Sequence, residues 1–407
     1  MNLLFAWRYF KAPKSTNAIN IIAWVSMVAI IVGVAALIVV LSGFNGFEGL
    51  VKSLYSPFYP HLQLLHASGK TLVLTPQQLE QLKSNPAIRG YSLVAEDKAL
   101  LQNGELQSLV YLKGVDESYS AVTSIKDHVV AGKYALGNVD EPAILMGVGV
   151  ENALGLQSDR SLLPLTAFLF RRGGSINTAD PLQSLSSANV NPAGAFVVQQ
   201  EFDNQYVLTN IDFVRRMLDW QPDEYSAVEI ALQKPEEVLD VQKQLQAELG
   251  KNYKVLTRFE QNQSLYTVMR VEKWVIFAIL SLILAVASFN MIGALTMLVM
   301  EKQKDIQVLK AMGSPKSQIQ KIFLTEGVML ALIGTLLGFL IAAILCWAQA
   351  KYGLIPLQGN TFIVEYYPVD MQWKDFVLVF GTVTVVALLA SWFPARKAAV
   401  ERIELKS

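Results

Sequence analysis

Four long runs without a charged side chain constrain this 407-residue chain more than any other feature. They cover residues 15–47, 274–300, 327–350 and 376–395. A helix needs about 20 apolar residues to cross the roughly 30 Å hydrocarbon core of a bilayer, so all four runs are long enough. The first run is too long for the apolar region of a signal peptide and lacks a suitable cleavage site, so we interpret it as a retained anchor. Four buried helices of a soluble protein are the alternative.

The positions of Lys and Arg orient the four predicted spans. Basic residues precede the first span, separate the second from the third, and follow the fourth; they include Arg8, Lys11, Lys14, Lys302, Lys304, Lys310, Lys316, Lys321, Arg396 and Lys397. Four crossings place these three segments on one side, and the positive-inside rule makes that side the cytoplasm. We therefore expect a multi-pass protein of the inner (cytoplasmic) membrane with both termini in the cytoplasm.

The predicted fold class is an α-helical membrane protein with four transmembrane helices plus a large α+β extracytoplasmic domain between helices 1 and 2. The expected segments are 1–18 (cytoplasmic), 19–43 (helix 1), 44–270 (periplasmic domain), 271–300 (helix 2), 301–321 (cytoplasmic segment), 322–350 (helix 3), 351–375 (short periplasmic loop), 376–395 (helix 4) and 396–407 (cytoplasmic tail). Inside the domain, Asn103-Gly104 between two β-rich runs predicts a hairpin.

No pattern for catalysis, metal binding or nucleic-acid binding is found. The three histidines lack metal-ligand spacing, and the single cysteine, Cys346, excludes a disulfide framework. There is no GxSxG and no Walker motif, so the chain is not expected to hydrolyse ATP or to bind a cofactor or metal. A net charge of zero gives no indication of a nucleic-acid partner. Acidic residues such as Asp203 are interpreted as solvated surface groups.

The charged segment MEKQKDIQVLKAMGSPKSQIQKIF, residues 300–323, separates the second and third runs. Helical phasing brings Ile306, Leu309, Lys310 and Gly313 near one face, with Val308 and Met312 adjacent to it. Gly313 is expected to end this helix, and Ser314 to cap a second helix with Pro315 at its first position. Charges of both signs favour docking into a groove on a protein over binding to lipid headgroups, which is the alternative.

A second unusual stretch, residues 161–194, joins apolar residues to an Arg-Arg-Gly-Gly run and a Ser/Asn/Pro-rich tail. A plain exposed loop is one interpretation. The other is a partner-docking loop, because exposed Leu163, Phe168 and Phe170 would otherwise favour aggregation.

The charged segment resembles the coupling segment of FtsX/MacB-type (type VII) ABC transporter permeases, whose pattern is roughly E-x-x-x-[DE]-I-x-x-L-[KR]-A-x-G. The matching positions are Glu301, Asp305, Ile306, Leu309, Lys310, Ala311 and Gly313. The terminal run with Pro394 and Ala395 is similar to the end of that family, giving an expected FtsX-like permease domain over 271–400. Residues 8–10, 20–22 and 40–48 resemble LolC/LolE-type lipoprotein-releasing permeases, and residues 197–220 resemble their Bacteroidetes members.

The resemblance implies a machine with several partners. A LolD-type ATPase dimer, carrying ATP and Mg, would bind the coupling segment, and a second permease copy, identical or a sister, would complete the membrane part. A lipoprotein would be the cargo, drawn from membrane lipid and passed to a LolA-type periplasmic carrier. The implied cargo-cavity residues are Phe44, Phe47, Val271 and Phe277. The implied carrier-docking residues are Leu163, Pro164, Phe168, Phe170, Arg171 and Arg172. An FtsX-like scaffold that regulates a periplasmic hydrolase, a MacB-like exporter and a membrane-anchored enzyme are the alternatives.

Overall fold

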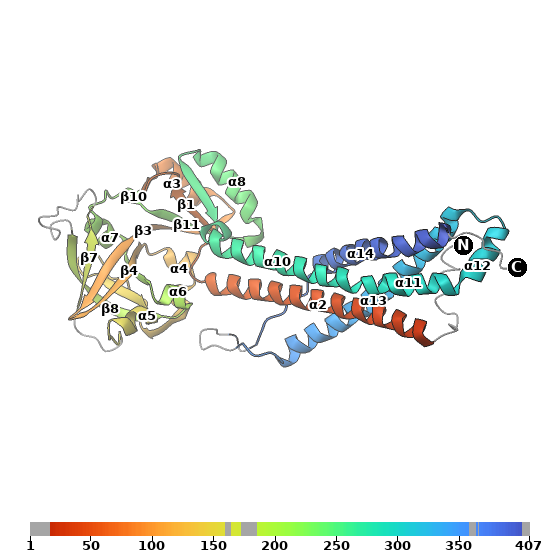
Figure 1. Cartoon of the computed structure of the whole chain (residues 1–407). Coiled ribbons are helices and arrows are strands. Elements are labelled where there is room, and N and C mark those ends of the chain that lie inside the picture. The colour runs from red at the N-terminus through yellow and green to blue at the C-terminus, as the bar shows by residue number, and fades with distance from the viewer. Residues whose placement is uncertain (1–16, 159–163, 172–184, 358–363, 365, 401–407) are drawn as a thin grey trace, which may run out of the picture. The chain divides into compact units, whose positions relative to one another are not determined.

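The computed structural model describes residues 17–158, 164–171, 185–357, 364 and 366–400 (Figure 1). The chain divides into two compact units. The helical unit contains the chain up to Leu50 and from Thr267 onward, and the α+β domain is Val51–Tyr266. The domain predicted at 44–270 is therefore slightly wider than the observed unit at both ends.

The helical unit contains the longest helices of the described chain together with the short helix α12. Their bounds are α2 (Asn17–Tyr55), α10 (Gln263–Ala287), α11 (Phe289–Glu301), α12 (Gln303–Ala311), α13 (Lys316–Tyr352) and α14 (Trp373–Val400). Helices α2 and α10 also lead into the α+β domain. Four helical stretches are long and apolar enough to cross a membrane: Trp24–Tyr55, Gln263–Glu301, Lys316–Tyr352 and Trp373–Val400. The predicted number and order of spans are thus confirmed.

Glycines let the helices of this unit approach closely. A Cβ atom added to Gly338 of α13 would lie 2.8 Å from the Val34 side chain of α2, and one added to Gly334 would lie 2.9 Å from Ile30. On another face of α2, a Cβ at Gly33 would lie 2.8 Å from Leu284 of α10. Small residues at such crossings are typical of membrane helices, which associate by close packing rather than by the hydrophobic effect.

Two helices are longer than the spans predicted within them. Helix α2 does not end near residue 43 but continues to Tyr55, and α13 begins at Lys316 rather than 322. The glycines of the S-G-F-N-G-F segment, residues 42–47, do not break α2. Gly is more frequent in membrane helices than in soluble ones, where it is a stronger helix-breaking signal. The second span is also divided, because α10 and α11 meet at Ser288.

The α+β domain is built on one large sheet with helices around it. The strands are β1 (Leu62–His66), β2 (Leu72–Val73), β3 (Ile88–Asn103), β4 (Leu106–Val115), β5 (Val129–Gly132), β6 (Ala143–Gly147), β7 (Leu165–Phe170), β8 (Leu185–Phe196), β9 (Tyr206–Asn210), β10 (Glu224–Tyr225), β11 (Ala227–Leu232) and β12 (Tyr253–Thr257). The helices are α3 (Pro76–Ser84), α4 (Tyr119–Val122), α5 (Val148–Ala153), α6 (Gln200–Asp203), α7 (Ile211–Leu218), α8 (Val238–Leu249) and α9 (Arg258–Gln261), with 3₁₀ turns η1 (Ile125–His128) and η3 (Pro235–Glu237).

Part of this sheet closes on itself. Pairing runs in a ring from β3 to β4, β9, β6, β8 and β7, and β7 returns to β3. The ring is completed because β3 is long: it pairs with β11 over Ile88–Val94 and with β7 over Ala99–Gln102, on the side away from β4. Strands β11, β1 and β12 extend the sheet from β3. Strand β3 therefore belongs to both the ring and this extension.

Local sequence signals explain the shorter elements. The β3–β4 hairpin is confirmed, with Asn103 paired to Leu106 and Gly104 in the left-handed region at φ 59°. The Asn210 side chain caps α7 by accepting hydrogen bonds from the amides of Asp212 and Phe213, and Gly250 ends α8. The loop interpretation of residues 161–194 is wrong in part, because β7 and most of β8 fall in this stretch.

Candidate functional site

The charged segment folds as a short helix, α12, held between α11 and α13. The amide of Gly313 donates to the carbonyl of Lys310, and the amide of Ser314 donates to that of Leu309. With Gly313 at φ 87°, these bonds form a Schellman motif, so the predicted glycine stop is confirmed. The predicted cap is wrong by one residue: Pro315 itself is the N-cap of α13, without a side-chain cap bond.

The side chains of α12 point in two directions. Ile306 is only 3% exposed and belongs to an apolar cluster with Leu298, Val299, Ile319, Phe323, Ala395 and Ala398. On the other side, Val308 is 59% and Met312 is 78% exposed. Ile306 therefore anchors α12 to its own bundle. The exposed face is carried by Val308 and Met312, which are not among the predicted coupling residues.

The other predicted coupling residues lie around this exposed face. Asp305 forms an ion pair with Lys302 at 3.7 Å, and its side chain is 48% exposed. Ala311 and Gly313 are exposed, while Glu301, Leu309 and Lys310 are half-buried. Asp305 and Ala311 are thus accessible to a partner, whereas Ile306 is not.

At the other end of the helical unit, α2 is tied to the connection between α13 and α14. The amide of Asp370 donates to the carbonyl of Ser42 at 2.9 Å, and the ring of Tyr367 stacks on Phe47 with centroids 6.3 Å apart. A Cβ atom at Gly46 would lie within 2.3 Å of the carbonyl oxygen of Pro368. The S-G-F-N-G-F segment is thus a contact surface for the α13–α14 connection.

A buried polar cluster joins three helices at the same level. The Asn45 side chain donates from Nδ2 to Asp375 Oδ2 at 2.5 Å and to the Asp370 carbonyl at 3.2 Å. Its Oδ1 accepts a hydrogen bond from Lys273 Nζ at 2.6 Å. Lys273 Nζ also lies 3.8 Å from Asp375 Oδ1. Sequence analysis missed this cluster because Lys273 and Asp375 each adjoin the end of an uncharged run, where charged residues are ordinary.

The predicted cargo-cavity residues lie near this cluster but differ in environment. Phe44 and Phe47 are half-buried on α2, and Phe47 is stacked on Tyr367. Val271 of α10 is 55% exposed, whereas Phe277 packs against the apolar core of the helical unit. Their role as a cavity stays a prediction.

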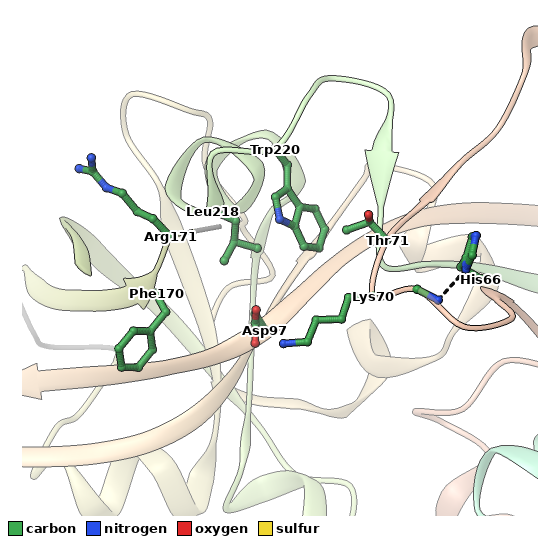
Figure 2. Close-up of a pocket in the computed structure, with 9 residues that line it drawn as sticks. His66, Lys70, Thr71, Asp97, Phe170, Arg171, Leu218 and Trp220 are labelled. Carbon is green, nitrogen blue, oxygen red and sulfur yellow. Dashed lines mark hydrogen bonds between the residues drawn. The ribbon is translucent and has the colours of Figure 1, made fainter. Parts of the chain in front are cut away.

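The α+β domain has a pocket of about 490 Å³ where β3 passes from β11 to β7 (Figure 2). Asp97 lies in this gap, between the residues of β3 that pair with β11 and those that pair with β7. The remaining lining residues are His66, Gly69, Lys70, Thr71, Phe170, Arg171, Leu218 and Trp220. In Figure 2 the side chain of Lys70 extends toward Asp97, while Phe170 and Arg171 point away from the centre. We call this site the seam pocket.

Two of the predicted carrier-docking residues line the seam pocket. Phe170 is 60% exposed, and Arg171 is held by a hydrogen bond from its Nε to Ser186 Oγ at 2.8 Å. Phe168, predicted to be exposed, is half-buried on β7, and Pro164 is exposed just before that strand. Leu163 and Arg172 lie outside the described residues.

The α+β domain also buries an ion pair that sequence analysis did not identify. Lys113 Nζ lies 2.6 Å from Glu229 Oε1, and the two side chains are 3% and 1% exposed. The ammonium lies 4.7 Å from the centroid of the Phe58 ring and 5.2 Å from that of Tyr119. Burial by itself would lower the pKa of Lys113, but the Glu229 and Glu96 carboxylates and Tyr119 raise it well above its usual value. Burial also raises the pKa of Glu229, and the ammonium opposes that rise.

Asp203 is a smaller correction of the same kind. It was interpreted as solvated, but it is only 9% exposed and accepts a hydrogen bond from the Val198 amide at 2.9 Å. Burial raises its pKa. Among the residues that the structure describes, no group of His, Cys, Asp and Glu is placed to hold a metal ion.

Comparison with known proteins supports the assignment of the helical unit. The family described as FtsX-like permease C-terminal matches residues 277–401, which begin in α10 and include α11 to α14. The chain carries an FtsX-like permease domain. The match includes α12 with its buried Ile306 and its exposed Val308 and Met312.

Curated relatives extend the similarity over most of the chain. It is 25% identical to the lipoprotein-releasing system transmembrane protein LolC of Xylella fastidiosa, over 78% of this chain and 76% of that protein. It is 26% identical to LolE of Haemophilus influenzae, over 84% of this chain and 83% of that protein. The periplasmic region of MacB from Actinobacillus actinomycetemcomitans covers 54% of this chain with a TM-score of 0.36 and 11% identity. In the chain, the α+β domain lies between the first two long apolar helices, and the similarity to LolC and LolE includes most of the chain.

Proposed function

We propose that this FtsX-like permease works with a separate, LolD-type ATPase dimer, which would bind ATP and Mg. The observation that carries the proposal is α12: a short charged helix anchored by Ile306 that presents Val308 and Met312 outward. Exposed apolar side chains beside the accessible charge of Asp305 suit a groove on a protein partner. The chain itself would supply no catalytic residue.

The proposed location is the inner membrane, with both termini and α12 in the cytoplasm. The basic segments around α12 and at the two ends support this orientation through the positive-inside rule. The α+β domain would then lie in the periplasm. A second permease copy, identical or a sister chain, would complete the membrane part.

We infer that the cargo is a lipoprotein, which the permease would extract from the inner membrane for transfer to a LolA-type carrier. The support is the similarity to LolC and LolE over more than three quarters of the chain. The proposal is tested by depleting the permease and fractionating the two membranes. Lipoproteins of the outer membrane should accumulate in the inner membrane; normal sorting would refute the cargo assignment. An undisturbed sorting pattern together with a bound cell-wall hydrolase would instead indicate an FtsX-like scaffold, and altered drug tolerance would indicate an exporter.

The rim of the seam pocket is the proposed docking place of the carrier. Phe170 offers an exposed aromatic ring, and Arg171 and Lys70 offer cations, so the rim suits an acidic surface with apolar patches. Deleting residues 163–172 would remove β7 and break the strand ring, so point substitutions are the better test. Phe170→Asp with Arg171→Glu should reduce crosslinking to the carrier. Val130→Asp is the matched control, because Val130 is 62% exposed on β5 and does not line the seam pocket. Equal crosslinking in both variants would refute this docking place.

A further inference from the structure

The S-G-F-N-G-F segment of α2 is a feature that the proposed coupling to an ATPase does not explain. Its backbone and side chains hold the α13–α14 connection through Ser42, Gly46 and Phe47. Its remaining polar side chain, Asn45, is 3% exposed and makes every hydrogen bond that its amide donors can make. Asn45 therefore connects α2 both to α14, through Asp375, and to α10, through Lys273.

The two connections made by Asn45 differ in strength. Toward α14, its amide donates to a carboxylate and to a backbone carbonyl, and Gly46 packs against the backbone at Pro368. Toward α10, Asn45 accepts one hydrogen bond from Lys273 at 2.6 Å, and Lys273 itself makes a longer ionic contact with Asp375 of α14 at 3.8 Å. The Asp375 side chain is 8% exposed and that of Lys273 is 26% exposed. Water can therefore replace the partners of Lys273 while the contact between α2 and α14 stays intact.

The face of α10 below Lys273 is apolar and turned toward α2. Phe277, Leu280 and Leu284 follow Lys273 at helical spacing, and all three pack in the core of the helical unit. Leu284 meets α2 at Gly33, which lies 12 residues before Asn45 and hence about 18 Å along the helix. Lys273 thus lies at the polar end of an apolar interface between α2 and α10.

We propose that Asn45, Lys273 and Asp375 form a releasable latch, in which Lys273 holds the end of α10 against α2 and α14. When Lys273 leaves Asn45, α10 separates from α2 and the stripe of Phe277 and Leu280 becomes accessible to an apolar chain. This role rests on the proposed function, because an apolar cargo drawn from the membrane needs an accessible apolar surface.

The latch is tested by thiol labelling of the full-length protein in native membranes. The single native cysteine, Cys346, is replaced by Ser. A new thiol, introduced as Leu280→Cys, then reports access to the interface between α2 and α10 through its rate of reaction with N-ethylmaleimide. Lys273→Met should raise that rate roughly tenfold, the scale expected when one charge-assisted hydrogen bond is lost. Lys273→Arg should restore the slow rate, because it keeps the cation.

Lys374→Met is the matched control. Lys374 is exposed, adjoins Asp375 on the same helix and takes no part in the described network. If Lys374→Met raises labelling as much as Lys273→Met, or if Lys273→Met leaves it unchanged, the latch is refuted. Normal folding of each variant is checked by its membrane level and by its elution as a single species.

This experiment separates the latch from the proposed cargo, because labelling needs neither lipoprotein nor ATPase. Labelling that follows Lys273 while lipoproteins are sorted normally after depletion would refute the cargo and support the latch. Mis-sorted lipoproteins after depletion with labelling that ignores Lys273 would support the cargo and refute the latch.

Discussion

Replacing Glu229 by Gln should destabilise the α+β domain strongly. The substitution keeps the shape of the side chain but removes the carboxylate that lies 2.6 Å from Lys113 Nζ. Lys113 would remain in place with its side chain 3% exposed, between the rings of Phe58 and Tyr119. Those rings attract a cation, but they do not replace a charge–charge contact.

The expected cost follows from this burial. Removing one partner of a buried ion pair typically costs about 3–5 kcal/mol, because the remaining charge loses its partner in a medium of low dielectric constant. The Glu96 carboxylate, which also acts on Lys113, should keep the cost toward the lower end of this range. In a domain of this size about 1 kcal/mol shifts the melting temperature by roughly 2–4 °C, so the expected fall is about 6–20 °C. Replacing both partners, as Lys113→Met with Glu229→Met, removes both charges of the ion pair and should cost less than the single change, because burial raises the pKa of the remaining Glu96 and favours its neutral form.

The assay is thermal unfolding of the full-length protein in detergent, followed by protease susceptibility of the α+β domain. Asp140→Asn with Arg216→Met is the matched control, because that ion pair spans 3.2 Å with side chains 90% and 52% exposed. Exposed pairs of this kind contribute about 0–1 kcal/mol. The reasoning fails if Glu229→Gln costs no more than this control, or if the double replacement costs as much as Glu229→Gln alone.

Three further predictions follow from other parts of the structure. Met312→Asp with Val308→Asp should weaken binding of the ATPase at least tenfold, because both side chains are exposed on α12. Ile306→Val, inside the bundle, should change binding by no more than about twofold. Pull-down from membranes measures both variants, and equal effects would contradict the assignment of the exposed face. Gly338→Ala should lower the membrane level of the protein, because its Cβ would lie 2.8 Å from Val34, whereas Gly381→Ala meets no atom within 4 Å and should be neutral. Burial and the nearby Arg258 and Arg89 lower the pKa of His61 from its usual 6.5 to about 4. The contribution of neutral His61 to the stability of the α+β domain should therefore be complete above about pH 6.5 and be lost as the pH falls through 4. The melting temperature should depend less on pH between 7 and 4 in His61→Asn, and an unchanged dependence would contradict this.

The spans were predictable because each depends on one local quantity, the length of an uncharged run. The Gly313 stop and the β3–β4 hairpin were predictable for a similar reason: each needs a left-handed backbone position, and glycine adopts it readily. The end of α2 was not predictable by the same rule, since Gly46 serves close packing against Pro368 rather than a turn. A glycine in the sequence does not say which of these two purposes it has.

The long-range features were beyond sequence reasoning. Strand β7 pairs with β3, about 65 residues earlier in the chain. Its sequence, LTAFLF, is a short and nearly continuous apolar run, which does not by itself identify a strand. On α12, periodicity identified an amphipathic helix but not which side faces its own bundle, so Ile306 was assigned to the partner. Only the positions of Ile319, Phe323 and Ala398 show that the buried side was already occupied.

Lys113 and Lys273 illustrate how burial separates two roles that look alike in sequence. Each is a single lysine in or beside an apolar run, and each lies 2.6 Å from an oxygen of a side chain far away in the chain. The Lys113 side chain is 3% exposed and that of Lys273 is 26% exposed. Water cannot reach Lys113 without local unfolding, so its contact with Glu229 persists as long as the domain is folded. Water can solvate the ammonium of Lys273 in the folded protein, so its contact with Asn45 can break and re-form during a working cycle.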